Sequence, residues 1–285
     1  MSRDVGDPTA AAVDLPEGVA RITLRGRYGT LAALESVPGG AARGVAVLVP
    51  GFTGSKEDFL AVLPPLADAG YRVVAYDQVG QWESEGPDDP DAYTLHAFVD
   101  DLLAVIRQVE PDNPVHVMGH SFGGVVARAG PAAAPERFRS LALLASRPGV
   151  DSDERAFRRR QMLDAVISGG RDGLWQLMNS APAADPLGAR HHEFRRRRLL
   201  ATREANLIGI LRVHDCAQDG TGALAGSGVP LLVAYGTEDL WPPRSHAEFA
   251  DRIGARQVVY PGAGHCPNEE CPQQLCTDLV AFWAG

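Results

Sequence analysis

The chain has 285 residues, of which 45% are hydrophobic and 22% are charged. This composition is ordinary for a globular protein and excludes a collagen-like, coiled-coil or wholly disordered chain. The length fits one large domain, or one domain with a sizeable insertion. A formal net charge of −9 at pH 7 argues against a basic nucleic-acid-binding surface, so we expect no nucleic-acid partner.

The chain ends and the cysteines favour a cytoplasmic protein. The first twenty residues contain no long apolar run, and the longest apolar runs elsewhere are strand-sized, so we expect neither a secretory signal nor contact with a membrane. The four cysteines (Cys216, Cys266, Cys271, Cys276) are expected to be reduced thiols. Three of them lie five residues apart, whereas zinc ligands usually have two to four intervening residues and a second cluster, so we expect no metal.

In chain order, the first elements predicted are two antiparallel strands over 21–24 and 30–37 and a fully buried strand over 45–49. A helix is expected next, with Ser55 as its N-cap, Asp58 three residues on, and Gly70 as its end. Strands over 72–76, 115–118 and 141–145 then alternate with helices over 94–109 and 122–133. After a long interruption, strands over 231–235 and 257–260 alternate with a helix near 245–253 and a C-terminal helix.

This alternation predicts an α/β fold with a mostly parallel central sheet of about eight strands flanked by helices. The interruption, residues 147–228, has helical periodicity and no convincing strand, so we interpret it as a helical cap inserted over the strand ends. The core domain would then comprise residues 1–146 and 229–285. In such sheets ligands bind beyond the carboxyl ends of the strands, so functional residues should directly follow strands.

The clearest chemical signal is the motif Gly119-His120-Ser121-Phe122-Gly123. Its G-x-S-x-G pattern has limited specificity alone, but it directly follows a predicted buried strand and opens a predicted helix. That setting lifts a serine hydroxyl clear of the backbone at the positive end of a helix. The context therefore predicts that Ser121 is a nucleophile.

A serine hydroxyl needs a general base, and the base needs an acid that orients it. Asp239 lies in the loop after the strand over 231–235, and His265 lies in the loop after the strand over 257–260. Ser121, Asp239 and His265 therefore follow the nucleophile–acid–base order of a hydrolase triad. Glu238 is the alternative acid.

The loop after the strand over 45–49 is the candidate oxyanion hole. It reads Pro50-Gly51-Phe52, and its small residue permits a sharp turn. We expect the backbone N–H groups of Phe52 and Phe122 to hold the negative charge that develops on a substrate carbonyl.

With these motifs the chain resembles the α/β-hydrolase superfamily over residues 20–146 and 229–284, and the insertion resembles its variable cap. Many members have His-Gly where this chain has Pro50-Gly51.

The segment from Asp77 to Ser84 is similar to the superfamily pattern D-x-R-G-x-G-x-S, with Val79 in place of the arginine. The H-G-G-P-G motif of proline iminopeptidases is absent from the sequence, which argues against an aminopeptidase. Asp77 is most simply a turn residue that accepts local backbone hydrogen bonds.

Aromatic and basic residues border the expected site. Three tryptophans are candidates for the substrate pocket (Trp82, Trp175, Trp241). The run 195–198 is four consecutive arginines, which a helix would distribute around its axis, so we interpret it as a solvated face, with one arginine on an anionic substrate group as the alternative. Three histidines of the insertion are interpreted as surface or cap-packing residues (His191, His192, His214).

The resemblance and the motifs together predict a serine hydrolase that cleaves a carboxylic ester, thioester or lactone of a small apolar or aromatic metabolite and needs no cofactor. Two alternatives stay open. One is a C–C bond hydrolase or cofactor-free lyase on the same fold, and the other is a ligand-sensing protein that keeps the triad without turnover.

Overall fold

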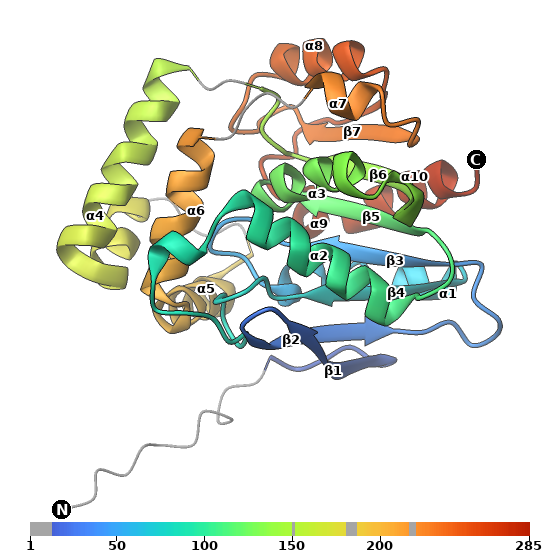
Figure 1. Cartoon of the computed structure of the whole chain (residues 1–285), viewed down its shortest axis with the longest axis horizontal. Coiled ribbons are helices and arrows are strands. Elements are labelled where there is room, and N and C mark those ends of the chain that lie inside the picture. Colours follow the sequence, from blue (N-terminus) through green and yellow to red (C-terminus); the bar gives the residue numbers. More distant parts are fainter. Residues whose placement is uncertain (1–12, 150–151, 181–186, 217–220) are drawn as a thin grey trace, which may run out of the picture.

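A computed structural model of the chain describes residues 13–149, 152–180, 187–216 and 221–285 (Figure 1). Residues 1–12, which make up most of the segment where we expect no secretory signal, lie outside this description, as do parts of the predicted insertion.

The centre of the molecule is an eight-stranded sheet in the order β1-β2-β4-β3-β5-β6-β7-β8. The two pairings that involve β2 are antiparallel and all the others are parallel. The predicted α/β fold with about eight strands is therefore confirmed. The strands are β1 (Val19–Gly26), β2 (Gly29–Ser36), β3 (Gly44–Val49), β4 (Tyr71–Tyr76), β5 (Val115–His120), β6 (Phe138–Leu144), β7 (Leu231–Gly236) and β8 (Arg256–Tyr260).

Strand β3 shows why the sheet lies inside the molecule. Its alternate residues enter two different hydrophobic clusters: Val47 and Val49 face one layer, and Ala46 and Leu48 face the other. All four are fully buried, as expected for a parallel strand covered by helices on both faces.

Helices cover both faces of the sheet. One face packs against α2 (Leu95–Val109), α3 (Phe122–Ala133) and α8 (Pro243–Ile253), and the other packs against α1 (Leu63–Asp68) and α10 (Pro272–Trp283). A short helix, α9 (Pro267–Glu270), precedes α10, and single 3-10 turns are formed by η2 (Pro90–Ala92) and η3 (Pro135–Arg137).

The predicted continuous helix after Ser55 is wrong. The segment forms a 3-10 turn, η1 (Lys56–Phe59), and then the separate helix α1. The reason is the pair Pro64 and Pro65, which have no N–H group to donate to carbonyls in a preceding helical turn. Prolines are tolerated in the first turn of a helix, so α1 begins at Leu63.

Three helices form a layer at one end of the sheet, on the left in Figure 1: α4 (Asp153–Met178), α5 (Ala189–Ala201) and α6 (Glu204–Cys216). They share a hydrophobic cluster whose fully buried members include Val166, Leu174 and Leu207. A fourth helix of the predicted insertion, α7 (Thr221–Ala225), packs instead against α3 and α8, and its Leu224 belongs to the main core.

The longest of these helices, α4, spans 26 residues with a kink at Gly170, where φ is 62°, and it carries charged side chains along its length. Within the described ranges, no helix is both long enough and apolar enough to cross a bilayer.

Candidate active site

Ser121 occupies a strained turn between β5 and α3. Its backbone has φ 52° and ψ −116°, a conformation that non-glycine residues rarely adopt. The flanking glycines make the turn possible, because a Cβ atom on Gly119 would lie 2.4 Å from the carbonyl oxygen of Gly123, and one on Gly123 would lie 2.2 Å from that of Val49. The turn thus presents the serine at the carboxyl end of β5 and the N-terminus of α3.

Two predicted residues lie in hydrogen-bonded series with this serine. His265 Nε2 is 3.0 Å from Ser121 Oγ, and His265 Nδ1 is 2.6 Å from Asp239 Oδ1. The Asp239 side chain is fully buried, whereas His265 keeps 23% of its side chain exposed. The alternative acid, Glu238, is exposed and accepts a hydrogen bond from the hydroxyl of Thr237 at 3.4 Å. The geometry therefore brings Asp239, and not Glu238, to the histidine.

The loop that carries His265 is held from both sides. The Glu270 carboxylate accepts hydrogen bonds from the N–H groups of Gly264 and Cys266, at 2.6 and 2.8 Å. His120 Nε2 donates to the carbonyl oxygen of His265 at 2.8 Å. Burial, together with the nearby His265, lowers the pKa of His120 to about 4, so His120 is neutral at pH 7.

A second histidine contacts Asp239, and sequence reasoning missed it. His246 Nε2 is 2.7 Å from Asp239 Oδ2, and neither side chain is exposed. Burial alone would raise the pKa of Asp239, but hydrogen bonds from His246 and His265 outweigh it, and the pKa is lowered. His246 follows Asp239 by seven residues and belongs to the next helix, α8. The contact therefore depends on how α8 packs against the loop that carries Asp239, which the sequence does not reveal.

Two buried glutamines hold the loop after β3, and sequence reasoning missed these contacts too. Gln78 Nε2 donates to the carbonyl oxygen of Pro50, and Gln81 Nε2 donates to that of Gly51, both at 2.9 Å. In a planar trans peptide the carbonyl and the following N–H point in opposite directions. The N–H of Phe52 therefore points away from the Gln81 amide.

The three predicted pocket tryptophans are not equivalent. The ring of Trp241 lies 5.7 Å from that of His265. Trp82 and Trp175 instead contact rings of α5 at 5.9 and 5.0 Å (Phe194, His192). Only Trp241 is thus placed beside the histidine of the hydrogen-bonded series.

Phe122 and Phe52 adjoin the serine turn in different ways. The Phe122 side chain is fully buried between the rings of Phe98 and His214, at 5.2 and 5.1 Å. Phe52 is half-buried and packs against both the main core and the cluster shared by α4, α5 and α6. Phe52 therefore touches both the sheet and the helical layer above it.

The arginine run 195–198 is not the solvated face that its sequence suggested. The first three arginines are half-buried, and Arg198 is buried in an ion pair with Asp58 and a 3.1 Å hydrogen bond to Ser55 Oγ. The difference arises because α5 lies against the turn η1, which covers one side of the helix. His191, also on α5, contacts Glu269 of α9 at 3.1 Å.

Asp77 is also more than a turn residue. Its carboxylate accepts from the N–H of Glu83 at 3.3 Å, as a turn residue would, and it also lies 2.9 Å from Lys56 Nζ. Burial raises the pKa of Asp77 to about 7, although the ammonium opposes that shift. Burial also disfavours the charged form of Lys56, but its three carboxylate neighbours, Asp77, Glu57 and Glu83, outweigh this and raise the Lys56 pKa.

The cysteines beside His265 do not form a ligand set. Cys266, Cys271 and Cys276 are free thiols. In the part of the chain that the structure describes, no group of three or more His, Cys, Asp or Glu side chains is arranged to hold a metal ion.

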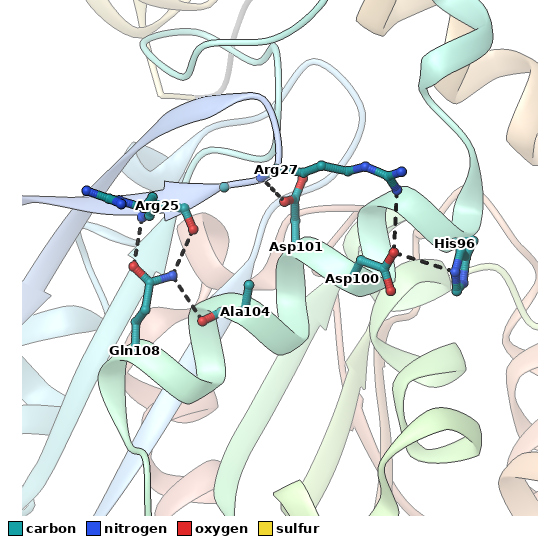
Figure 2. A pocket seen from close by; sticks show the side chains of 8 residues that line it. Arg25, Arg27, His96, Asp100, Asp101, Ala104 and Gln108 are labelled. Atoms are coloured by element: carbon teal, nitrogen blue, oxygen red, sulfur yellow. Dashed lines mark hydrogen bonds and ion pairs between the residues drawn. The ribbon is translucent and has the colours of Figure 1, made fainter.

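A separate groove of about 650 Å³ lies between the β1–β2 hairpin and α2 (Figure 2). Its polar side chains largely pair with one another: Asp100 lies 3.5 Å from both Arg27 and His96, and Gln108 bonds the backbone of Arg25. None of the residues predicted for the site lines this groove.

Comparison with known proteins places the chain among hydrolases. A sequence model described as the Alpha/beta hydrolase family matches residues 46–278. Epoxide hydrolase A of Mycobacterium tuberculosis is 35% identical over 294 residues, which cover 85% of this chain and 90% of that protein. Probable oxidoreductase EphD of the same organism is 43% identical over 79 residues, but this match spans 28% of this chain and only 13% of the length of EphD.

Among solved structures, the enol-lactonase from Burkholderia xenovorans LB400 is similar, with a TM-score of 0.76. The two chains are 23% identical, and the match covers 93% of this chain and 100% of the other. At that identity, the likeness shows a shared fold.

Proposed function

The chain belongs to the alpha/beta hydrolase family, and we propose that it is a serine hydrolase that cleaves a carboxylic ester, thioester or lactone of a small apolar or aromatic metabolite through an acyl-enzyme. The observation that carries this proposal is the series Ser121–His265–Asp239, with contacts of 3.0 and 2.6 Å. A nucleophile, a base and an orienting acid within hydrogen-bond reach are the requirements for activating a serine.

In the acylation step, His265 Nε2 takes the proton of Ser121 while Oγ attacks the substrate carbonyl carbon. Asp239 holds the Nδ1–H tautomer of His265 and stabilises the imidazolium that forms. The backbone N–H groups of Phe52 and Phe122 stabilise the oxygen that becomes negative. The bond from the acyl carbon to the leaving oxygen or sulfur then breaks, His265 gives its proton to that atom, and the serine remains acylated.

In the second step, a water molecule loses a proton to His265 and attacks the acyl carbon. The bond from the acyl carbon to Ser121 Oγ breaks, and His265 returns its proton to that oxygen. The products are the acid and a regenerated serine. These steps involve only residues of the chain, the substrate and water.

The substrate pocket is proposed to lie between the strand ends and the cap. Trp241 beside His265 and Phe52 between the two layers support an apolar lining. We assign the cap to residues 147–228 and the core to 1–146 and 229–285, with α4, α5 and α6 as the part of the cap that lies over the site. Trp82 and Trp175 would then shape the pocket through the packing of α5.

The test is turnover of a short acyl-ester dye by wild-type protein and by Ser121→Ala, together with covalent labelling by a fluorophosphonate. Ser121→Ala should lose at least about 10⁴-fold in kcat and all labelling, because it removes the nucleophile. The control is Ser168→Ala, which changes an exposed serine on α4 and should act like wild type. Ester turnover retained by Ser121→Ala would overturn the proposal.

Epoxide hydrolysis is a second candidate, because one relative that covers 85% of this chain is named epoxide hydrolase A. Attack of Ser121 on an epoxide carbon would leave an ether, which water does not readily cleave, whereas an acyl-enzyme is an ester that the second step can hydrolyse. The serine at this position therefore favours acyl substrates. A panel of esters, thioesters, lactones, epoxides and C–C bond substrates separates these reactions, and ligand binding without turnover would indicate a sensor.

A further inference from the structure

We propose that His246 is a positioning residue: it holds the carboxylate of Asp239 in the orientation in which its other oxygen accepts a hydrogen bond from His265. The inference rests on the proposed function, since it extends the series Ser121–His265–Asp239 by one residue. His246 lies in the first turns of α8 and does not contact the serine.

The contacts of Asp239 fix both of its oxygens. Oδ1 accepts from His265 Nδ1 and from the N–H of Leu240, each at 2.6 Å. Oδ2 accepts from His246 Nε2 at 2.7 Å. Rotation of the carboxylate would break all three bonds, and the Asp239 and His246 side chains are shielded from water that could replace them. His246 therefore determines the plane in which Asp239 faces His265.

The His246 ring is itself held in place. It stacks on Tyr235 with centroids 4.4 Å apart and planes 13° apart, and it meets Trp241 edge-on at 6.2 Å. In the described residues its Nδ1 has no hydrogen-bond partner. A contact to a carboxylate requires a donor, so the proton sits on Nε2.

The arrangement has a consequence for turnover. During acylation His265 becomes positively charged, and the negative charge of Asp239 stabilises it. Without the N–H of His246, Oδ2 would be a buried acceptor with no donor, and the carboxylate would rotate to find one. His265 would then lose the alignment that places its Nε2 on the serine.

Two substitutions separate the hydrogen bond from the stacking. His246→Gln keeps an N–H near the position of Nε2 but loses the ring, and His246→Phe keeps a ring on Tyr235 but loses the donor. We expect His246→Gln to keep kcat within about 3-fold of wild type, and His246→Phe to lower kcat about 10- to 100-fold with KM nearly unchanged. The reverse order would mean that His246 serves packing only and would overturn the proposal.

A measurement without turnover separates this inference from the proposed function. The downfield proton resonance of His265 Nδ1–H reports its hydrogen bond to Asp239. It should persist in His246→Gln and be displaced or broadened in His246→Phe, and an unchanged resonance in His246→Phe would overturn the proposal. If Ser121→Ala kept its activity, the serine mechanism would fail while this measurement still decided the role of His246. Thermal unfolding shows whether each variant is folded. If His246→Phe does not fold, His246→Met, which also lacks the donor, takes its place.

Discussion

At the scale of single residues, the side-chain amide of Gln81 fixes a peptide group of the loop after β3. Gln81 is fully buried, and its donor reaches the carbonyl oxygen of Gly51. Because this turns the N–H of Phe52 the opposite way, Gln81 would orient one donor of the proposed oxyanion hole without touching the substrate. Gln78 holds the preceding peptide in a similar way, through the carbonyl oxygen of Pro50, but the N–H of that peptide belongs to Gly51.

These neighbouring glutamines give a matched pair of variants. Gln81→Met should lower kcat about 10- to 100-fold with little change in KM, because an oxyanion donor acts mainly in the transition state. Gln78→Met removes a similar buried amide that also bonds the loop after β3. It should lower kcat much less, because the peptide that Gln78 holds does not carry the N–H of Phe52. Steady-state kinetics on the ester dye measures both, and equal losses in the two variants would contradict a specific role for the Gly51–Phe52 peptide.

At the scale of elements, α5 is attached to the core by a buried ion pair. Arg198 of α5 and Asp58 of η1 retain only 6% and 9% of their side-chain exposure. Asp58 is fixed further, because its carboxylate accepts from the N–H of Ser55 at 3.2 Å and its carbonyl accepts from Asn268 Nδ2 at 2.8 Å. Helix α5 is therefore joined to the turn after β3 and, through Asp58, to α9, which follows the histidine loop.

Arg198→Met should weaken this junction. Removing one partner of a buried ion pair leaves an uncompensated charge on Asp58, so we expect the free energy of unfolding to fall by about 3–5 kcal/mol. The control is Arg196→Met, on the same helix. The Arg196 side chain is 43% exposed, and its ion pair with Glu193 is long, at 4.0 Å, so its loss should change stability little. Urea denaturation gives both values, and hydrogen exchange should show faster opening of α5 in Arg198→Met. Equal stability of the two variants would contradict the anchoring role.

Elements were predictable from sequence where local pattern decides them. The strands, α2 and α3 follow from apolar periodicity. Helix α2 begins at Leu95, one residue after the predicted start, because Thr94 is its N-cap and accepts from the N–H of Ala97. The break before α1 was missed because the periodicity of the apolar side chains continues across Pro64 and Pro65.

The candidate site was predictable only in part, for a related reason. Ser121, Asp239 and His265 each directly follow a strand of a parallel sheet, so their meeting at one edge could be expected from topology. The contacts of His246, Gln81 and Arg198 depend on how separate loops and helices pack in three dimensions. No local spacing encodes such contacts, which is why the arginine run was misread as a solvated face.

At the scale of the whole molecule, buried histidines make stability depend on pH. His116 bonds Ser140 Oγ at 2.8 Å and stacks on Trp283 at 5.1 Å. Burial lowers the pKa of His116 to about 4. Between pH 4 and the usual histidine value of 6.5, the unfolded chain therefore binds more protons than the folded one. The contribution of neutral, buried His116 to the free energy of unfolding is full above pH 6.5 and is lost as the pH falls toward 4.

His116→Phe should reduce the pH dependence of the free energy of unfolding between pH 6.5 and 4.5 by up to about 1.4 kcal/mol per pH unit. The control is His96→Phe, whose side chain is 82% exposed and should leave the slope unchanged. The raised pKa of Asp77 makes stability change with pH in the opposite direction. This effect is the same in wild type and in both variants, so it cancels when their slopes are compared. Chemical denaturation across this range measures the slopes, and parallel curves for wild type and His116→Phe would refute the assignment.

The buried Lys56 has a practical consequence, because it is the only lysine in the sequence. Its side chain is 1% exposed and surrounded by carboxylates, so acylating reagents that need a neutral, accessible amine cannot react with it in the folded state. The folded body therefore has no lysine available for amine-directed crosslinking or surface coupling. Modification of Lys56 therefore requires the structure around Asp77, Glu57 and Glu83 to open, and its rate measures how often that opening occurs.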